Sequence, residues 1–279
     1  MIIRSRPHGW QLLYILRGSI VPAIAPKVLA ILTLSIAVAA VVELAPPVGI
    51  ERVSVTPFTL LGLVLSIFLS FRNSACYDRW WEGRKLWGQL VFESRSLARQ
   101  VQVLLADDAP RRQRISYLTT AFAYALAARL RARDVALAAV PELAQARREG
   151  TLDSILYVQL EERLHAMSSI QAGCERILTT PLPFAYTLLL HRCAWMFCVL
   201  LPFGLASSLG WATPVLSAVL AYAFFGLDQL GEEMEDPFGL EPNDLPLDAL
   251  VRTIEIDQLD ALGERPLPEP LLPQGYLLQ

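Results

Sequence analysis

The sequence predicts an all-α membrane protein, and three observations lead to this fold class. Hydrophobic residues make up 54% of the 279-residue chain and charged residues only 18%, whereas soluble domains carry about 25% charged residues. The mean hydropathy is +0.40. Four apolar segments stand apart from a more charged middle region, in which apolar residues recur at helical spacing.

The four apolar segments are interpreted as membrane-spanning helices. They comprise residues 28–42, 57–71, 181–206 (interrupted by Pro202) and 214–227; the first reaches about 20 residues with its apolar flanks. Basic residues precede the first segment and follow the second, whereas the connectors on the other side hold only Arg52: Arg4, Arg6, Arg17, Lys27, then Arg72, Arg79, Arg84, Lys85. The excess of basic residues marks the cytoplasmic side. Both termini and the long middle region are therefore expected in the cytoplasm.

The middle region is predicted to be helical. Helices are expected over residues 84–105, 114–134 and 152–178, with a further helix at 245–262 before an extended Pro-rich tail. The second and third apolar segments are expected to continue into this region as long helices. Trp80, Trp81 and Trp87 are expected to anchor the second at the interface or to pack between subunits. Arg72 and Asn73 are expected to cap neighbouring helix ends or to line the inner mouth.

This gives five predicted regions. They are an N-terminal interfacial helix (1–27), transmembrane helices 1 and 2 (28–72), a cytosolic helical region (73–180), transmembrane helices 3 and 4 (181–232), and a cytosolic C-terminal helix and tail (233–279).

One apolar stripe of the second segment has two interpretations. Leu60, Leu63, Ile67 and Phe71 stand at i, i+3, i+7 and i+11, so they share one helix face. The stripe either faces lipid or packs against another helix, or else it lines a pore formed by several copies. An apolar ring of this kind gates by dewetting.

Charged residues near the third segment also leave two readings. If the helix enters the bilayer near Pro181, then Arg192 lies near mid-depth, beside His191, and needs a partner such as Asp228. If it enters later, Arg192 lies at the interface and extends its head group to water.

Several function classes are excluded or disfavoured by the sequence. The four cysteines and three histidines form no C-x-x-C, H-E-x-x-H or H-x-x-H pattern, and no P-loop, Rossmann or nucleophile-elbow motif occurs. The net charge of −3 gives no indication of nucleic-acid binding. We expect no enzyme activity, no metal site and no cofactor.

Four stretches, in chain order, carry a recognisable signature. They are PFTLLG…SIFLSFRNSACYDRWWEGRKLWG, GCERILTTPLPFAYTLLLHR, CVLLPFGL and EEMEDPFGLEPNDLPLDA. Together they resemble the bestrophin family in its short bacterial form, over most of the chain up to about Pro268. The resemblance is weakest around residues 130–153.

The resemblance implies a homopentamer in the plasma (inner) membrane, with four transmembrane helices per subunit around a central pore. It places the pore neck at Leu63, Ile67 and Phe71, and a cytosolic aperture at Ile155. Animal members bind calcium through an acidic run after P-F-G, but here only Glu241 and Asp244 follow within that stretch. This departure argues against calcium gating.

The expected partners are lipid and small monovalent ions. By the family resemblance, animal members conduct chloride, whereas members of the bacterial type resemble cation-preferring channels. The vestibule residues Asp78, Glu82 and Glu161 favour cations here, with chloride as the other outcome. The rival hypothesis is a non-conducting scaffold that recruits a partner through its cytosolic helices and Pro-rich tail.

Overall fold

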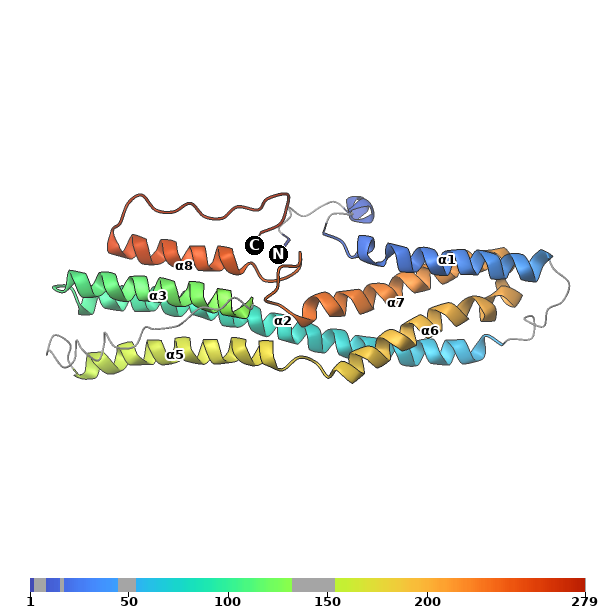
Figure 1. Ribbon diagram of the computed structural model, residues 1–279, viewed down its shortest axis with the longest axis horizontal. Coiled ribbons are helices and arrows are strands. Elements are labelled where there is room, and N and C mark those ends of the chain that lie inside the picture. Colours follow the sequence, from blue (N-terminus) through green and yellow to red (C-terminus); the bar gives the residue numbers. More distant parts are fainter. Residues whose placement is uncertain (3–8, 16–17, 45–53, 132–153, 279) are drawn as a thin grey trace. The chain divides into compact units, whose positions relative to one another are not determined.

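The computed structural model describes residues 1–2, 9–15, 18–44, 54–131 and 154–278, and in these ranges the regular elements are helices. Their order along the chain is shown in Figure 1: η1 (Gly9–Tyr14), α1 (Val21–Leu44), α2 (Thr56–Leu104), α3 (Ala109–Leu130), α5 (Ser154–Thr179), α6 (Phe184–Leu209), η3 (Gly210–Ala212), α7 (Thr213–Glu235) and α8 (Leu247–Leu262). The all-α prediction is confirmed in the described part of the chain.

Internal contacts divide the chain into two compact units. The apolar unit comprises Arg6–Asp78 and Pro181–Glu235, and the amphipathic unit comprises Met1–Ser5, Arg79–Thr180 and Asp236–Gln279. The helix α2 contributes its first part to the apolar unit and its second part to the amphipathic unit.

Among the described residues, three segments are long and apolar enough to cross a membrane: Val21–Leu44, Thr56–Leu104 and Phe184–Glu235. The third contains α6 and α7, which are separated by the short η3 turn. Helix α6 runs through Pro202 without a break, so the expected interruption of the helix at this proline is wrong.

Helix α1 extends beyond the apolar run 28–42 on both sides, over Val21–Leu44, in agreement with the apolar flanks expected for this segment. Pro22 lies in the first turn, where the backbone N–H has no helical partner, so proline costs little there. The N-terminal segment before it holds the 3₁₀ turn η1, with Trp10 and Tyr14 exposed.

The expectation of continuous long helices holds for α2 and fails for α6. Helix α2 runs for 49 residues and includes Arg72, Asn73 and the tryptophans Trp80, Trp81 and Trp87. Helix α5 ends at Thr179, and α6 begins anew at Phe184. Pro181 and Pro183 explain the break, since each disfavours helical geometry in the residue before it.

The apolar unit has a core formed by all four of its long helical segments. Helix α1 packs against α6 and α7 (Figure 1). Buried aromatic pairs join α6 to α7: ring centroids are 4.8 Å apart for Trp195–Phe225 and 4.9 Å apart for Phe197–Phe224. Leu65 and Leu69 bring one face of α2 into the same cluster.

The amphipathic unit has its own core, and Trp87 lies fully buried in it with Leu90 and Leu97. In the described chain Trp87 therefore packs within one subunit and not at an interface. Trp80 donates from Nε1 to the carbonyl of Asn243 at 3.0 Å. Trp80 therefore links α2 to the loop before α8 through a hydrogen bond.

That loop holds Asp244, whose carboxylate is buried and accepts from the Glu241 N–H at 2.6 Å. Burial raises the pKa of Asp244 from 3.8 to about 6, with the Glu241 N–H opposing the shift. The folded state thus binds a proton more tightly than the unfolded chain. This contribution to stability is complete below pH 4 and is lost as the pH rises through about 6.

We therefore expect Asp244→Asn to raise the melting temperature by about 2–4 °C at about pH 8 and to leave it unchanged at about pH 4. Thermal melts of the detergent-solubilised protein measure the effect. Glu269→Gln, at an exposed carboxylate of the tail, is the matched control and should change neither value. An equal shift at both pH values contradicts the assignment.

Candidate functional site

The predicted neck residues lie together on the outer face of α2. Leu63 is 59% exposed, Ile67 46% and Phe71 65%. The opposite face of the same helix is buried and holds Leu65, Leu69, Arg72 and Cys76 at i, i+4, i+7 and i+11. Within the described chain these three side chains are therefore about half exposed or more, and none of them belongs to the buried core of the apolar unit.

The exposed stripe continues beyond Phe71. Asp78 follows seven residues later, which is about two helical turns, and its side chain is exposed. The stripe is therefore apolar over its first three turns and then ends in a carboxylate. The neighbouring Glu82 differs, because it forms an ion pair with Arg176 at 2.5 Å.

The remaining predicted site residues lie on α5, in the amphipathic unit. Ile155, the predicted aperture, is 72% exposed in the first turn of the helix. Glu161 is partly exposed. In the described chain, no group of three or more His, Cys, Asp and Glu side chains is placed to hold a metal ion.

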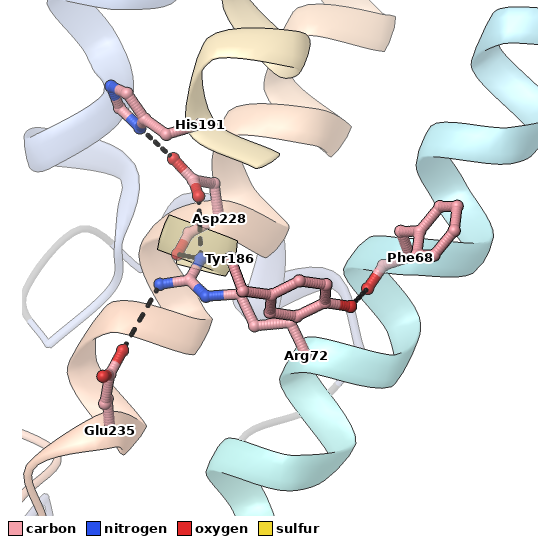
Figure 2. Close-up of polar contacts among 6 residues, drawn as sticks. All are labelled: Phe68, Arg72, Tyr186, His191, Asp228 and Glu235. Carbon is pink, nitrogen blue, oxygen red and sulfur yellow. Dashed lines mark hydrogen bonds and ion pairs between the residues drawn. The ribbon is translucent and has the colours of Figure 1, made fainter. Parts of the chain in front are cut away.

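A buried charge cluster lies in the apolar unit and was not predicted. Arg72 is only 1% exposed, and its Nη1 lies 2.8 Å from Oδ1 of Asp228, whose side chain is 4% exposed. The same Nη1 donates to the Asp228 carbonyl at 3.2 Å. The other carboxylate oxygen of Asp228 lies 2.6 Å from Nδ1 of His191 (Figure 2).

This cluster corrects two expectations. Arg72 caps no helix end in the described chain, because it is buried and paired with Asp228, seven residues before the end of α7. The partner of Asp228 is Arg72 and not Arg192, which is exposed on α6. The helical phase of α2 was the available signal, since Arg72 shares the face of Leu65, Leu69 and Cys76.

A cavity of about 440 Å³ opens beside the cluster. Ten residues of the apolar unit line it: Arg72, Pro181, Leu182, Phe184, Thr187, Leu188, His191, Asp228, Glu232 and Glu235. The lining is acidic, and His191 is the member of the charge cluster with the greatest access to it, being 40% exposed.

Gly231 allows the close approach of α7 to α2 at this site. A Cβ there would lie 2.5 Å from Oδ1 of Asn73 and 3.3 Å from Nη1 of Arg72. The first distance is too short for a side chain, so the two helices or Asn73 must move to admit one.

We expect Gly231→Ala to lower the free energy of unfolding by about 1–3 kcal/mol, the usual cost of overpacking. Thermal or denaturant unfolding in detergent measures it. Gly88→Ala is the control, because its Cβ would meet only Nη1 of Arg84, at 3.8 Å, and alanine favours the helix. Equal behaviour of the two variants contradicts the close approach.

Comparisons with known proteins identify the family of the chain. The family model described as bacterial/fungal bestrophin protein matches residues 1–143 and 135–260. A voltage-dependent anion channel-forming protein of Mesorhizobium japonicum is 47% identical over 95% of this chain and 94% of its own length. One of the same name from Escherichia coli K12 is 41% identical over 99% of both.

A solved structure is also similar. The crystal structure of a bacterial bestrophin homologue from Klebsiella pneumoniae matches with a TM-score of 0.83 and 37% identity, over 87% of this chain and 100% of that one. Fold and apolar helices define an all-helical membrane protein. More specifically, the chain belongs to the bestrophin family, in its bacterial and fungal branch.

Proposed function

We propose that this protein is an ion channel in which five copies of the chain surround a central pore. The observation that carries the proposal is the exposed stripe of α2: Leu63, Ile67 and Phe71 share one helix face and are 46–65% exposed in the described chain. Facing an axis, these side chains form stacked apolar rings that control conduction through dewetting. The names of the relatives, anion channel-forming proteins, support a channel over an enzyme.

We infer four membrane spans per subunit, namely α1, the first part of α2, α6 and α7. Helices α6 and α7 have 26 and 23 residues, or roughly 34–39 Å each. Each exceeds the bilayer core of about 30 Å. Flanking basic residues support an inner-membrane protein with both termini in the cytoplasm.

The charge preference follows from groups at the ends of an uncharged neck. Asp78 lies exposed on the neck face, and five copies of it at the inner mouth would concentrate cations there. Glu161 would add to this field in the vestibule, whereas the charge of Glu82 is offset by Arg176, and Ile155 would form a second constriction. The relatives' names favour anions instead, so we take cation preference as the hypothesis and anion preference as its rival. No calcium or other cofactor enters the proposal.

Recording from purified protein in planar bilayers tests the function. We expect single-channel currents from the wild type and larger currents from a Leu63→Ala/Ile67→Ala/Phe71→Ala variant, because the constriction widens. The reversal potential in a salt gradient gives the preferred ion, and Asp78→Asn should move it toward anions. The particle mass should equal five chains of 31.0 kDa each.

The rival function is a non-conducting scaffold with a partner bound to the cytosolic helices or the Pro-rich tail. It predicts that neither the wild type nor the triple-alanine variant carries current in bilayers, and that a pull-down recovers a stoichiometric partner. A monomeric particle would also count against the channel, since a closed ring of subunits is what builds an axial pore.

A further inference from the structure

Helix α6 carries a single cation on an exposed face that is otherwise apolar. Leu189, Arg192, Met196 and Leu200 stand at i, i+3, i+7 and i+11, so they share one side of the helix, and all four are exposed. Leu189 is 58% exposed, Met196 48% and Leu200 43%. The charge of Arg192 therefore lies between apolar side chains one turn before it and one turn after it.

Arg192 has no anionic partner among the described residues. The two other Lys and Arg side chains that the structure describes in the apolar unit are both held: Arg72 pairs with Asp228 at 2.8 Å, and Nζ of Lys27 lies 5.9 Å from the centre of the Phe225 ring. Arg192 belongs to none of the ion pairs within the described ranges. Its charge is thus left for a group that the chain itself does not supply there.

The position of Arg192 along α6 sets its depth in the bilayer. The helix has 26 residues, so it is about 39 Å long and exceeds a hydrocarbon core of about 30 Å by about 4–5 Å at each end when centred. In the proposed topology α6 enters from the cytoplasmic side. Arg192 follows the first residue of the helix, Phe184, by eight positions, or about 12 Å, which places its Cα about 7–8 Å inside the core.

The side chain of Arg192 can leave the hydrocarbon in one direction. Helical side chains tilt toward the N-terminus of their helix, which for α6 is the cytoplasmic boundary of the core. Long basic side chains at this depth extend along apolar surface and bring the charged head to the interface. The guanidinium is therefore directed to the level of the lipid phosphates of the inner leaflet.

We propose that Arg192 binds the phosphate of an anionic phospholipid, whose acyl chains lie along Met196 and Leu200. This inference rests on the membrane topology of the proposed function. The planar guanidinium donates two parallel hydrogen bonds to a pair of phosphate oxygens. A headgroup without an ammonium keeps its full negative charge for this contact, and the exposed apolar side chains deeper on the same face of α6 match the chains below the phosphate.

Lipid retention measured by native mass spectrometry tests the site. The purified protein in a neutral detergent receives either phosphatidylglycerol or phosphatidylcholine with the same acyl chains. The wild type should retain phosphatidylglycerol at a lipid concentration roughly tenfold lower, as expected for a charge-assisted contact. Arg192→Gln removes the charge and should retain the two lipids equally. Arg265→Gln is the control, because this exposed arginine pairs with Asp260 in the amphipathic unit, and it should keep the preference.

Two results would overturn the lipid site directly: a preference for phosphatidylglycerol that persists in Arg192→Gln, or its absence from the wild type. An Arg192→Gln particle of lower mass with unchanged lipid retention also overturns it, because the arginine then pairs with a carboxylate of another copy. If inorganic phosphate alone releases phosphatidylglycerol from the wild type, the site takes free phosphate instead of lipid. Equal melting temperatures of wild type and Arg192→Gln without added lipid exclude misfolding.

The lipid site and the channel can fail separately. Lipid retention does not depend on current, so a wild type that prefers phosphatidylglycerol but carries no current in bilayers, even with the widened neck, overturns the channel alone. A conducting wild type without the lipid preference overturns the role of Arg192 alone.

Discussion

Arg72→Met is expected to lower the free energy of unfolding by about 3–5 kcal/mol, the usual loss when one member of a buried ion pair is removed. The variant would leave the carboxylate of Asp228, only 4% exposed, with His191 as its remaining side-chain partner. Asp228→Leu should cost a similar amount, because the guanidinium of Arg72 would stay buried with Glu235 at 3.7 Å. Denaturant unfolding in mild detergent measures both losses.

The double variant Arg72→Met/Asp228→Leu separates the pair from its surroundings. Since both charges are removed together, its loss should be much smaller than the sum of the two single losses. The control is Arg265→Met in the exposed pair with Asp260, whose atoms are 2.7 Å apart. Such surface pairs contribute about 0–1 kcal/mol. If Arg72→Met costs no more than Arg265→Met, the buried pair does not hold α2 to α7.

The sequence predicts the helices well because their signals are local. The periodicity of residues 245–262 corresponds to α8 at Leu247–Leu262, and the long apolar and amphipathic run corresponds to α2. The errors in the predicted helix boundaries occur at prolines, because the effect of a proline on a helix depends on its position. Pro26 and Pro202 are tolerated within helices, whereas Pro181 and Pro183 separate α5 from α6.

The candidate site also has one part that local spacing predicts and one part that depends on residues far apart in the sequence. The stripe of Leu63, Ile67 and Phe71 is visible from spacing alone, and the structure adds that the three side chains are 46–65% exposed in the described chain. The Arg72–Asp228 pair joins residues 156 positions apart. Periodicity places Arg72 on the buried face of α2 but carries no information on which distant carboxylate meets it, so this part of the site required the structure.

Ile67→Asp should change the ion selectivity of the channel by roughly tenfold or more in favour of cations. Five carboxylates would stand in the narrowest part of the proposed pore, and rings of charge select ions of opposite sign. Even at an effective dielectric constant near 20, a charge about 4 Å from the ion contributes several kcal/mol. Ile67→Lys should shift the reversal potential in the opposite direction. Both are measured in bilayers under a salt gradient.

Val219→Asp is the matched control, because Val219 is an exposed apolar residue on α7, away from the stripe. A carboxylate that faces lipid costs about 2.5–3.5 kcal/mol near the bilayer centre, so this variant should insert poorly and leave the reversal potential of any surviving channels unchanged. In a hydrated pore the carboxylate at position 67 keeps its water, so Ile67→Asp should insert like the wild type. If Ile67→Asp instead inserts as poorly as Val219→Asp and selectivity stays constant, the stripe faces acyl chains and the pore lies elsewhere.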